Sequence, residues 1–100
     1  MDVKGTHLAL VKEVLAKIVP DRRVVAFGSR ITQTARETSD LDLCVMGSHS
    51  LSFDMLAALR QAFSDSNIPY RVDVVDWASA DEAFQNIIQE KFEIIQAGND

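Results

Sequence analysis

Three aspartates, Asp40, Asp42 and Asp73, stand at positions from which their carboxylates could share one site. Asp40 and Asp42 are two residues apart at the start of the apolar run LDLCVM, residues 41–46. Because side chains on a strand alternate between its faces, both aspartates are expected to point to one side and Leu41 to the other. Asp73 lies within another apolar run, YRVDVVDW, residues 70–77, and joins the pair if the two strands are neighbours.

Such a cluster predicts a site for divalent metal. Three carboxylates brought together without a cation repel one another and raise one another's pKa values. Hard oxygen ligands at this density suit Mg²⁺ or Mn²⁺. Magnesium held by a few carboxylates, with its other positions left to water and phosphate, is typical of phosphoryl transfer. Two such ions can stabilise both the attacking and the leaving oxygen.

Gly28 and Ser29 follow a short apolar run, residues 23–27, and are candidates for phosphate binding. A glycine lets backbone N–H groups approach a phosphate closely, and the serine hydroxyl adds a donor. A helix that begins directly after them would add the attraction of its N-terminus for anions.

Each of these features also has a simpler explanation when taken alone. Asp40 could cap or turn the chain before the strand, and a Gly-Ser pair at a strand end is commonly a turn. Asp73 could face solvent on a half-exposed strand. Asp76, expected in the turn after that strand, is a spare candidate for the third ligand. The combination of all these positions is more specific than any one of them.

The surrounding pattern predicts an α/β (α+β) fold, in which a small mixed sheet of three or more strands has helices packed on it. Helices are expected at about residues 6–19, 52–65 and 80–95, and strands at about 23–27, 41–46 and 70–77. The polar stretch 29–38 could be a short helix or a loop. The link between the first two strands allows either a parallel crossover or an antiparallel return.

Composition limits the possible functions. The chain has 100 residues, expected to form one domain over 1–100, with 47% hydrophobic residues and a net charge of −5. This charge argues against stable, sequence-independent nucleic acid binding, which needs clustered Lys and Arg. Cys44 is the only cysteine, so an intrachain disulfide is excluded. Because neither a signal peptide nor an apolar run of about 20 residues is present, we expect no membrane association and a cytoplasmic location.

The segment FGSR…SDLDLCV, residues 27–45, resembles the signature of the polymerase-beta-like nucleotidyltransferases. It is most similar to the minimal nucleotidyltransferases, commonly the antitoxin half of toxin–antitoxin pairs whose toxin is a HEPN ribonuclease. The resemblance implies a nucleotidyltransferase-like fold, a nucleoside triphosphate and two divalent ions, Mg²⁺ or Mn²⁺. It also implies transfer of a nucleoside monophosphate to an acceptor hydroxyl. For HEPN-paired antitoxins the transferred group is typically AMP from ATP, and the acceptor is a tyrosine of the toxin.

Carried over by position, Gly28 and Ser29 would hold the triphosphate, Asp40 and Asp42 would ligate metal, and Asp73 would be the third carboxylate. Many relatives have Gly-Ser-Arg-Ala-Arg-Gly where this chain has GSRITQ, residues 28–33. Arg30, which is kept, could contact phosphate or form a structural ion pair.

Two other hypotheses stay open at this stage. The chain could be an antitoxin that inhibits its partner by binding alone, without catalysis. It could also transfer a nucleotide to a small-molecule acceptor, although larger relatives that do so carry extra domains for that acceptor.

Overall fold

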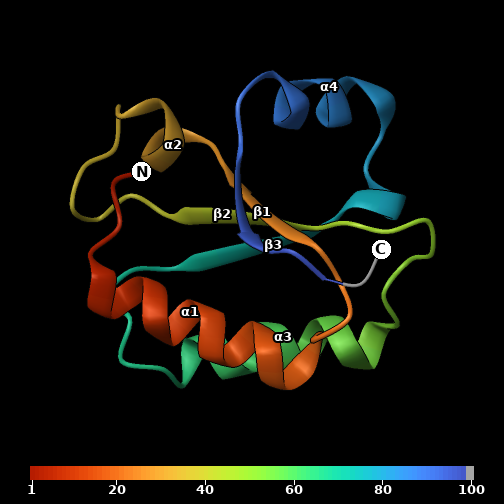
Figure 1. Cartoon of the computed structure of the whole chain (residues 1–100), viewed down its shortest axis with the longest axis horizontal. Coiled ribbons are helices and arrows are strands. Elements are labelled where there is room, and N and C mark those ends of the chain that lie inside the picture. Colours follow the sequence, from red (N-terminus) through yellow and green to blue (C-terminus); the bar gives the residue numbers. More distant parts are fainter. Residues whose placement is uncertain (99–100) are drawn as a thin grey trace.

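The computed structural model describes residues 1–98 as a sheet with helices on both faces (Figure 1). The elements in chain order are α1 (Gly5–Ile18), β1 (Val24–Phe27), α2 (Ser29–Thr32), β2 (Leu41–Val45), α3 (Phe53–Ser64), β3 (Val72–Asp76), the short 3-10 helix η1 (Trp77–Ser79), α4 (Glu82–Glu90) and β4 (Glu93–Gln96). No helix within this range is long and apolar enough to cross a bilayer.

The sheet has four strands in the order β3-β2-β1-β4. β1 is antiparallel to both β2 and β4, whereas β2 and β3 are parallel. The predicted mixed sheet with packed helices is therefore confirmed. The connection left open by the sequence is an antiparallel return from β1 to β2. The parallel pair β2–β3 is joined through α3, because parallel strands need a long crossover connection.

Alternation along the strands separates two apolar layers. On one face, below the sheet in Figure 1, α1 and α3 cover a core that includes Val24, Leu43 and Val74. On the other face α4 covers a smaller cluster around Val25, Phe27, Cys44 and Ile88. Asp42 alternates with Leu43 and shares its face with Cys44, so its carboxylate lies on the α4 side.

The predicted last helix over residues 80–95 is wrong from residue 91 onward. α4 ends at Glu90, and the following residues form β4, which pairs with β1. Ile95 is buried in the larger core, and the side chain of Gln96 donates to the backbone oxygen atoms of Val19 and Arg22 at 2.8 Å each. These tertiary contacts outweigh the helical spacing of the apolar residues.

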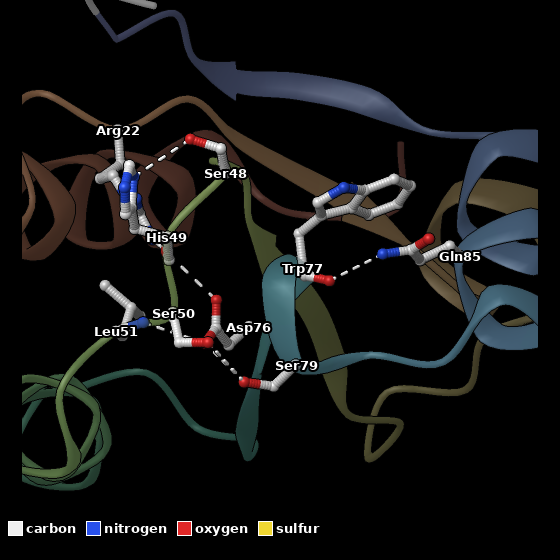
Figure 2. A network of polar contacts seen from close by, with 9 residues as sticks. All are labelled: Arg22, Ser48, His49, Ser50, Leu51, Asp76, Trp77, Ser79 and Gln85. Carbon is white, nitrogen blue, oxygen red and sulfur yellow. Dashed lines mark hydrogen bonds and ion pairs between the residues drawn. The ribbon is translucent and has the colours of Figure 1, made fainter.

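The C-terminal end of β3 is held by a buried polar network (Figure 2). Asp76, the last residue of β3, is 6% exposed and accepts hydrogen bonds from the Leu51 backbone N–H and the Ser79 hydroxyl, both at 2.9 Å. Arg22 lies 3.9 Å from the Asp76 carboxylate and donates to the His49 backbone oxygen at 2.7 Å. This network ties β3 to the loop after β2 and to the turn before β1.

Candidate active site

The two strands predicted to bring the carboxylates together are direct neighbours in register. Asp42 on β2 is the register partner of Asp73 on β3 and, on its other side, of Phe27 on β1. Register partners in a sheet project to the same face, so both carboxylates lie on the α4 side. Asp40 stands one residue before β2, exposed to solvent.

The electrostatics of Asp42 show that the three carboxylates interact. The pKa of the Asp42 carboxyl is raised from 3.8 to about 6, chiefly by burial and then by the negative charges of Asp73 and Asp40. The guanidinium of Arg71 acts in the opposite direction and lowers this pKa. Asp42 therefore lies in the combined field of both other aspartates, and an added cation would relieve that field.

Gly28 lies directly against the Asp42 carboxylate. Its backbone has φ 82° and ψ −158°, a region open in practice only to glycine. A Cβ atom placed there would collide with the Asp42 carboxylate oxygen and lie 3.2 Å from Cγ. Helix α2 begins at Ser29, with Gly28 as its N-cap. The structure thus brings the Gly-Ser pair beside the aspartate cluster, as the motif predicted.

Arg30 has neither of the two environments predicted for it, an open phosphate site or a structural ion pair. It is 5% exposed, and its guanidinium donates to the backbone oxygen atoms of Asp2, Glu37 and Ser39 at 2.7–3.0 Å. It also lies 3.7 Å from the ring centroid of Tyr70. Its partners are carbonyl groups and an aromatic ring rather than a carboxylate or an open phosphate site. Arg30 therefore anchors the loop that leads to Asp40.

Asp76, the spare candidate for the third ligand, belongs to the opposite face of the sheet. It alternates with Asp73 and Val75 and shares the face of Val74, which lies in the core under α1 and α3. Its carboxylate pairs with Arg22 and accepts hydrogen bonds from Leu51 and Ser79. The spare assignment was wrong, because three positions along a strand reverse the face.

The donor chemistry of the cluster fits a hard divalent ion held in an open site. Among residues 1–98, no three His, Cys, Asp or Glu side chains are grouped closely enough to form a ready metal cage. Magnesium in phosphoryl-transfer sites is commonly bound by one or two carboxylates, with water and substrate phosphate completing its coordination. Asp42 and Asp73 in register, with the charge of Asp40 nearby, match that kind of site.

Arg71 is the residue near this site whose role the sequence did not predict. Its guanidinium Nη2 lies 3.6 Å from Asp73 Oδ1. The available signal was the spacing Arg-x-Asp on a strand, which places both side chains on one face.

Comparison with known proteins finds similarity both by sequence and by structure. Residues 11–99 match the family described as "Polymerase beta, Nucleotidyltransferase". The chain is 44% identical over 96 residues to "Probable protein adenylyltransferase MntA" of Haemophilus influenzae, covering 96% of this chain and 84% of that protein.

Two solved structures show the same fold at low identity. One is a toxin–antitoxin structure with AMP-PNP, with a TM-score of 0.77, 22% identity and coverage of 90% of this chain and 73% of that one. The other contains a tri-AMPylated Shewanella oneidensis HEPN toxin in complex with an MNT antitoxin, with a TM-score of 0.70, 20% identity and coverage of 92% and 71%. The extent of the family match and the 44% identity together show that this chain belongs to the polymerase-beta nucleotidyltransferase family.

Proposed function

We propose that this chain is the antitoxin of a HEPN toxin–antitoxin pair and transfers AMP from ATP to a tyrosine hydroxyl of its partner ribonuclease. The observation that carries the proposal is the register of Asp42 with Asp73 beside Gly28. The name of the Haemophilus relative and the complexes in the similar structures support the choice of protein acceptor and nucleotide.

Each residue has a distinct task in this proposal. The backbone of Gly28 and the Ser29 hydroxyl bind the triphosphate at the start of α2, and Arg30 supports them from behind without touching phosphate. Asp40, Asp42 and Asp73 hold two Mg²⁺ or Mn²⁺ ions. Bound there, the ions would neutralise charge on the transferred phosphate and on the attacking and leaving oxygens.

The reaction is an in-line displacement at the α-phosphorus of ATP. The tyrosine oxygen forms a bond to phosphorus, the bond to the bridging oxygen of the β-phosphate breaks, and pyrophosphate leaves. Asp73, at the exposed edge strand β3, accepts the proton of the hydroxyl. Its position at the sheet edge gives an acceptor side chain from another protein access to the site.

Transfer of label tests the proposal directly. The protein is incubated with Mg²⁺, ATP labelled at the α-phosphate and the HEPN protein encoded beside it. We expect label on the partner with the wild-type chain and with Glu13→Gln, an exposed charge change on α1. We expect none with Asp42→Asn. Absence of label with the wild type, beside an active control enzyme, would contradict the proposal.

Inhibition by binding alone is a second candidate, favoured by exposed apolar side chains. Ile87, Phe92 and Ile94 are 59%, 41% and 56% exposed within the one short segment 87–94, and exposed apolar side chains grouped in this way suit a protein interface. If inhibition is by binding alone, the Asp42→Asn protein should still neutralise the ribonuclease at stoichiometric amounts. If inhibition is catalytic, the wild-type protein should neutralise the ribonuclease at substoichiometric amounts, and Asp42→Asn should not neutralise it at those amounts.

A further inference from the structure

Arg71 and Asp73 form an ion pair at the rim of the carboxylate cluster. Arg71 directly precedes β3 and Asp73 is its second residue, so the two lie two residues apart, and Nη2 lies 3.6 Å from Oδ1. The pair is open to water, with side-chain exposures of 73% for Arg71 and 39% for Asp73. An exposed pair of this kind is weak and readily exchanged for another partner.

The charges facing Asp42 come from three residues. Asp73 on β3 is its register partner, Asp40 precedes it by two residues, and the Arg71 guanidinium is paired with Asp73. Arg30, the arginine of the Gly-Ser-Arg motif, has its guanidinium bound to backbone carbonyls away from the cluster. Arg71 is thus the cation that the structure places on the third carboxylate of the cluster.

Arg71 also has space into which it can withdraw. A cavity of about 610 Å³ runs beside the edge strand β3, and its lining includes Arg71, Asp73, Arg60 and Phe63. The long flexible stem of an arginine can turn into such a space while its head stays hydrated. The ion pair can thus open without moving the backbone of β3.

We propose that Arg71 is an internal counter-ion of the carboxylate cluster and competes with divalent metal for Asp73. This inference rests on the proposed metal site and adds a residue that sets its affinity. In the metal-free protein the guanidinium balances Asp73. When the ion binds, Arg71 releases Asp73 and turns into the cavity. Its role is to position and screen Asp73, not to contact the reacting atoms.

Mn²⁺ binding by the full chain, measured without nucleotide by the EPR signal of free Mn²⁺, tests this competition. Arg71→Gln removes the competitor, so we expect its dissociation constant for Mn²⁺ to fall about two- to fivefold, the range for an exposed ion pair. Arg71→Lys keeps the charge and is expected to remain near the wild type. Lys12→Gln, the same charge change on α1 across the sheet, is the control. In an Asp73→Asn background the effect of Arg71→Gln should disappear.

The outcomes separate this inference from the proposed function. If wild-type protein binds Mn²⁺ and labels its partner while Arg71→Gln binds no tighter than Lys12→Gln, the competition is refuted and the enzyme assignment stands. Weaker binding by Arg71→Gln would also refute it. If no variant binds Mn²⁺, the metal site fails and the inference fails with it. Tighter binding that persists in Asp73→Asn would show that Arg71 acts elsewhere.

Discussion

Replacing Asp42 by asparagine should stabilise the metal-free protein while abolishing transfer. The carboxyl has a pKa of about 6 in the fold against an ordinary value of 3.8, so the folded state holds its proton more tightly than the unfolded chain. Between about pH 4 and pH 6 the native protein therefore binds more protons, and its stability falls as pH rises through this window. Above this pH window Asp42 is ionised in the folded protein, and its full destabilising effect on the free energy of unfolding is present.

The size of the effect follows from the pKa difference. The step from 3.8 to about 6 corresponds to roughly 3 kcal/mol, at about 1.4 kcal/mol per pKa unit. Asp42 is only partly buried, and part of its pKa shift comes from the charges of Asp73 and Asp40, which solvent screens. We therefore expect about half of this, roughly 1.5 kcal/mol at pH 7. For a domain of this size that is an increase in Tm of roughly 6–12 °C.

Urea denaturation in EDTA at pH 5 and pH 7.5 measures this effect. Asp42→Asn should exceed the wild type in the free energy of unfolding at pH 7.5, and the difference should shrink at pH 5. Glu13→Gln corrects for the general benefit of removing one negative charge from a chain of net charge −5. Mg²⁺ should narrow the gap by stabilising only the wild type. A variant no more stable than Glu13→Gln at pH 7.5 would refute the assignment of a repulsive, partly buried cluster.

Three further substitutions or treatments test other parts of the site. Gly28→Ala should cost at least about 1–3 kcal/mol in urea denaturation and abolish labelling, because of backbone strain and collision with the Asp42 carboxylate. Gly5→Ala, whose added methyl meets nothing within 4 Å, should be neutral or stabilising, and equal behaviour of the two would contradict this account. Arg30→Gln should cost about 3 kcal/mol by leaving backbone carbonyls without a charged donor, and should speed limited proteolysis within residues 33–40. Burial raises the pKa of the Cys44 thiol to about 12, so it should react with Ellman's reagent at pH 8 only as fast as the protein unfolds, and rapid native reaction would disprove its burial.

The faces of Asp42 and Asp73 could be predicted because strand alternation is strictly local. Asp42 and Leu43 must point to opposite sides wherever the strand lies, and the structure agrees. The sequence alone could not predict that β2 and β3 are neighbours, because their adjacency depends on how α3 packs. The register that places Asp42 opposite Asp73 shows that the two strands are neighbours.

Two features depended on contacts between distant parts of the chain and could not be predicted from spacing. Apolar residues from Phe84 to Ile95 fit helical periodicity, yet the last of them pairs into the sheet as part of β4. Arg30 stands in a motif associated with phosphate, yet carbonyl groups from both the N-terminus and the following loop surround its guanidinium. No local sequence pattern shows that β1 will pair with β4 or that these carbonyl groups will surround Arg30.

The crossover through α3 has a consequence for how activity arises during folding. Asp42 and Asp73 come from strands separated by the whole of this helix, so they meet only after a long loop has closed, a slow kind of event. No early hairpin, such as β1 with β2, contains both acids. Recovery of transferase activity on refolding should therefore follow the last cooperative phase, and a nascent chain that ends before β3 should emerge from the ribosome inert.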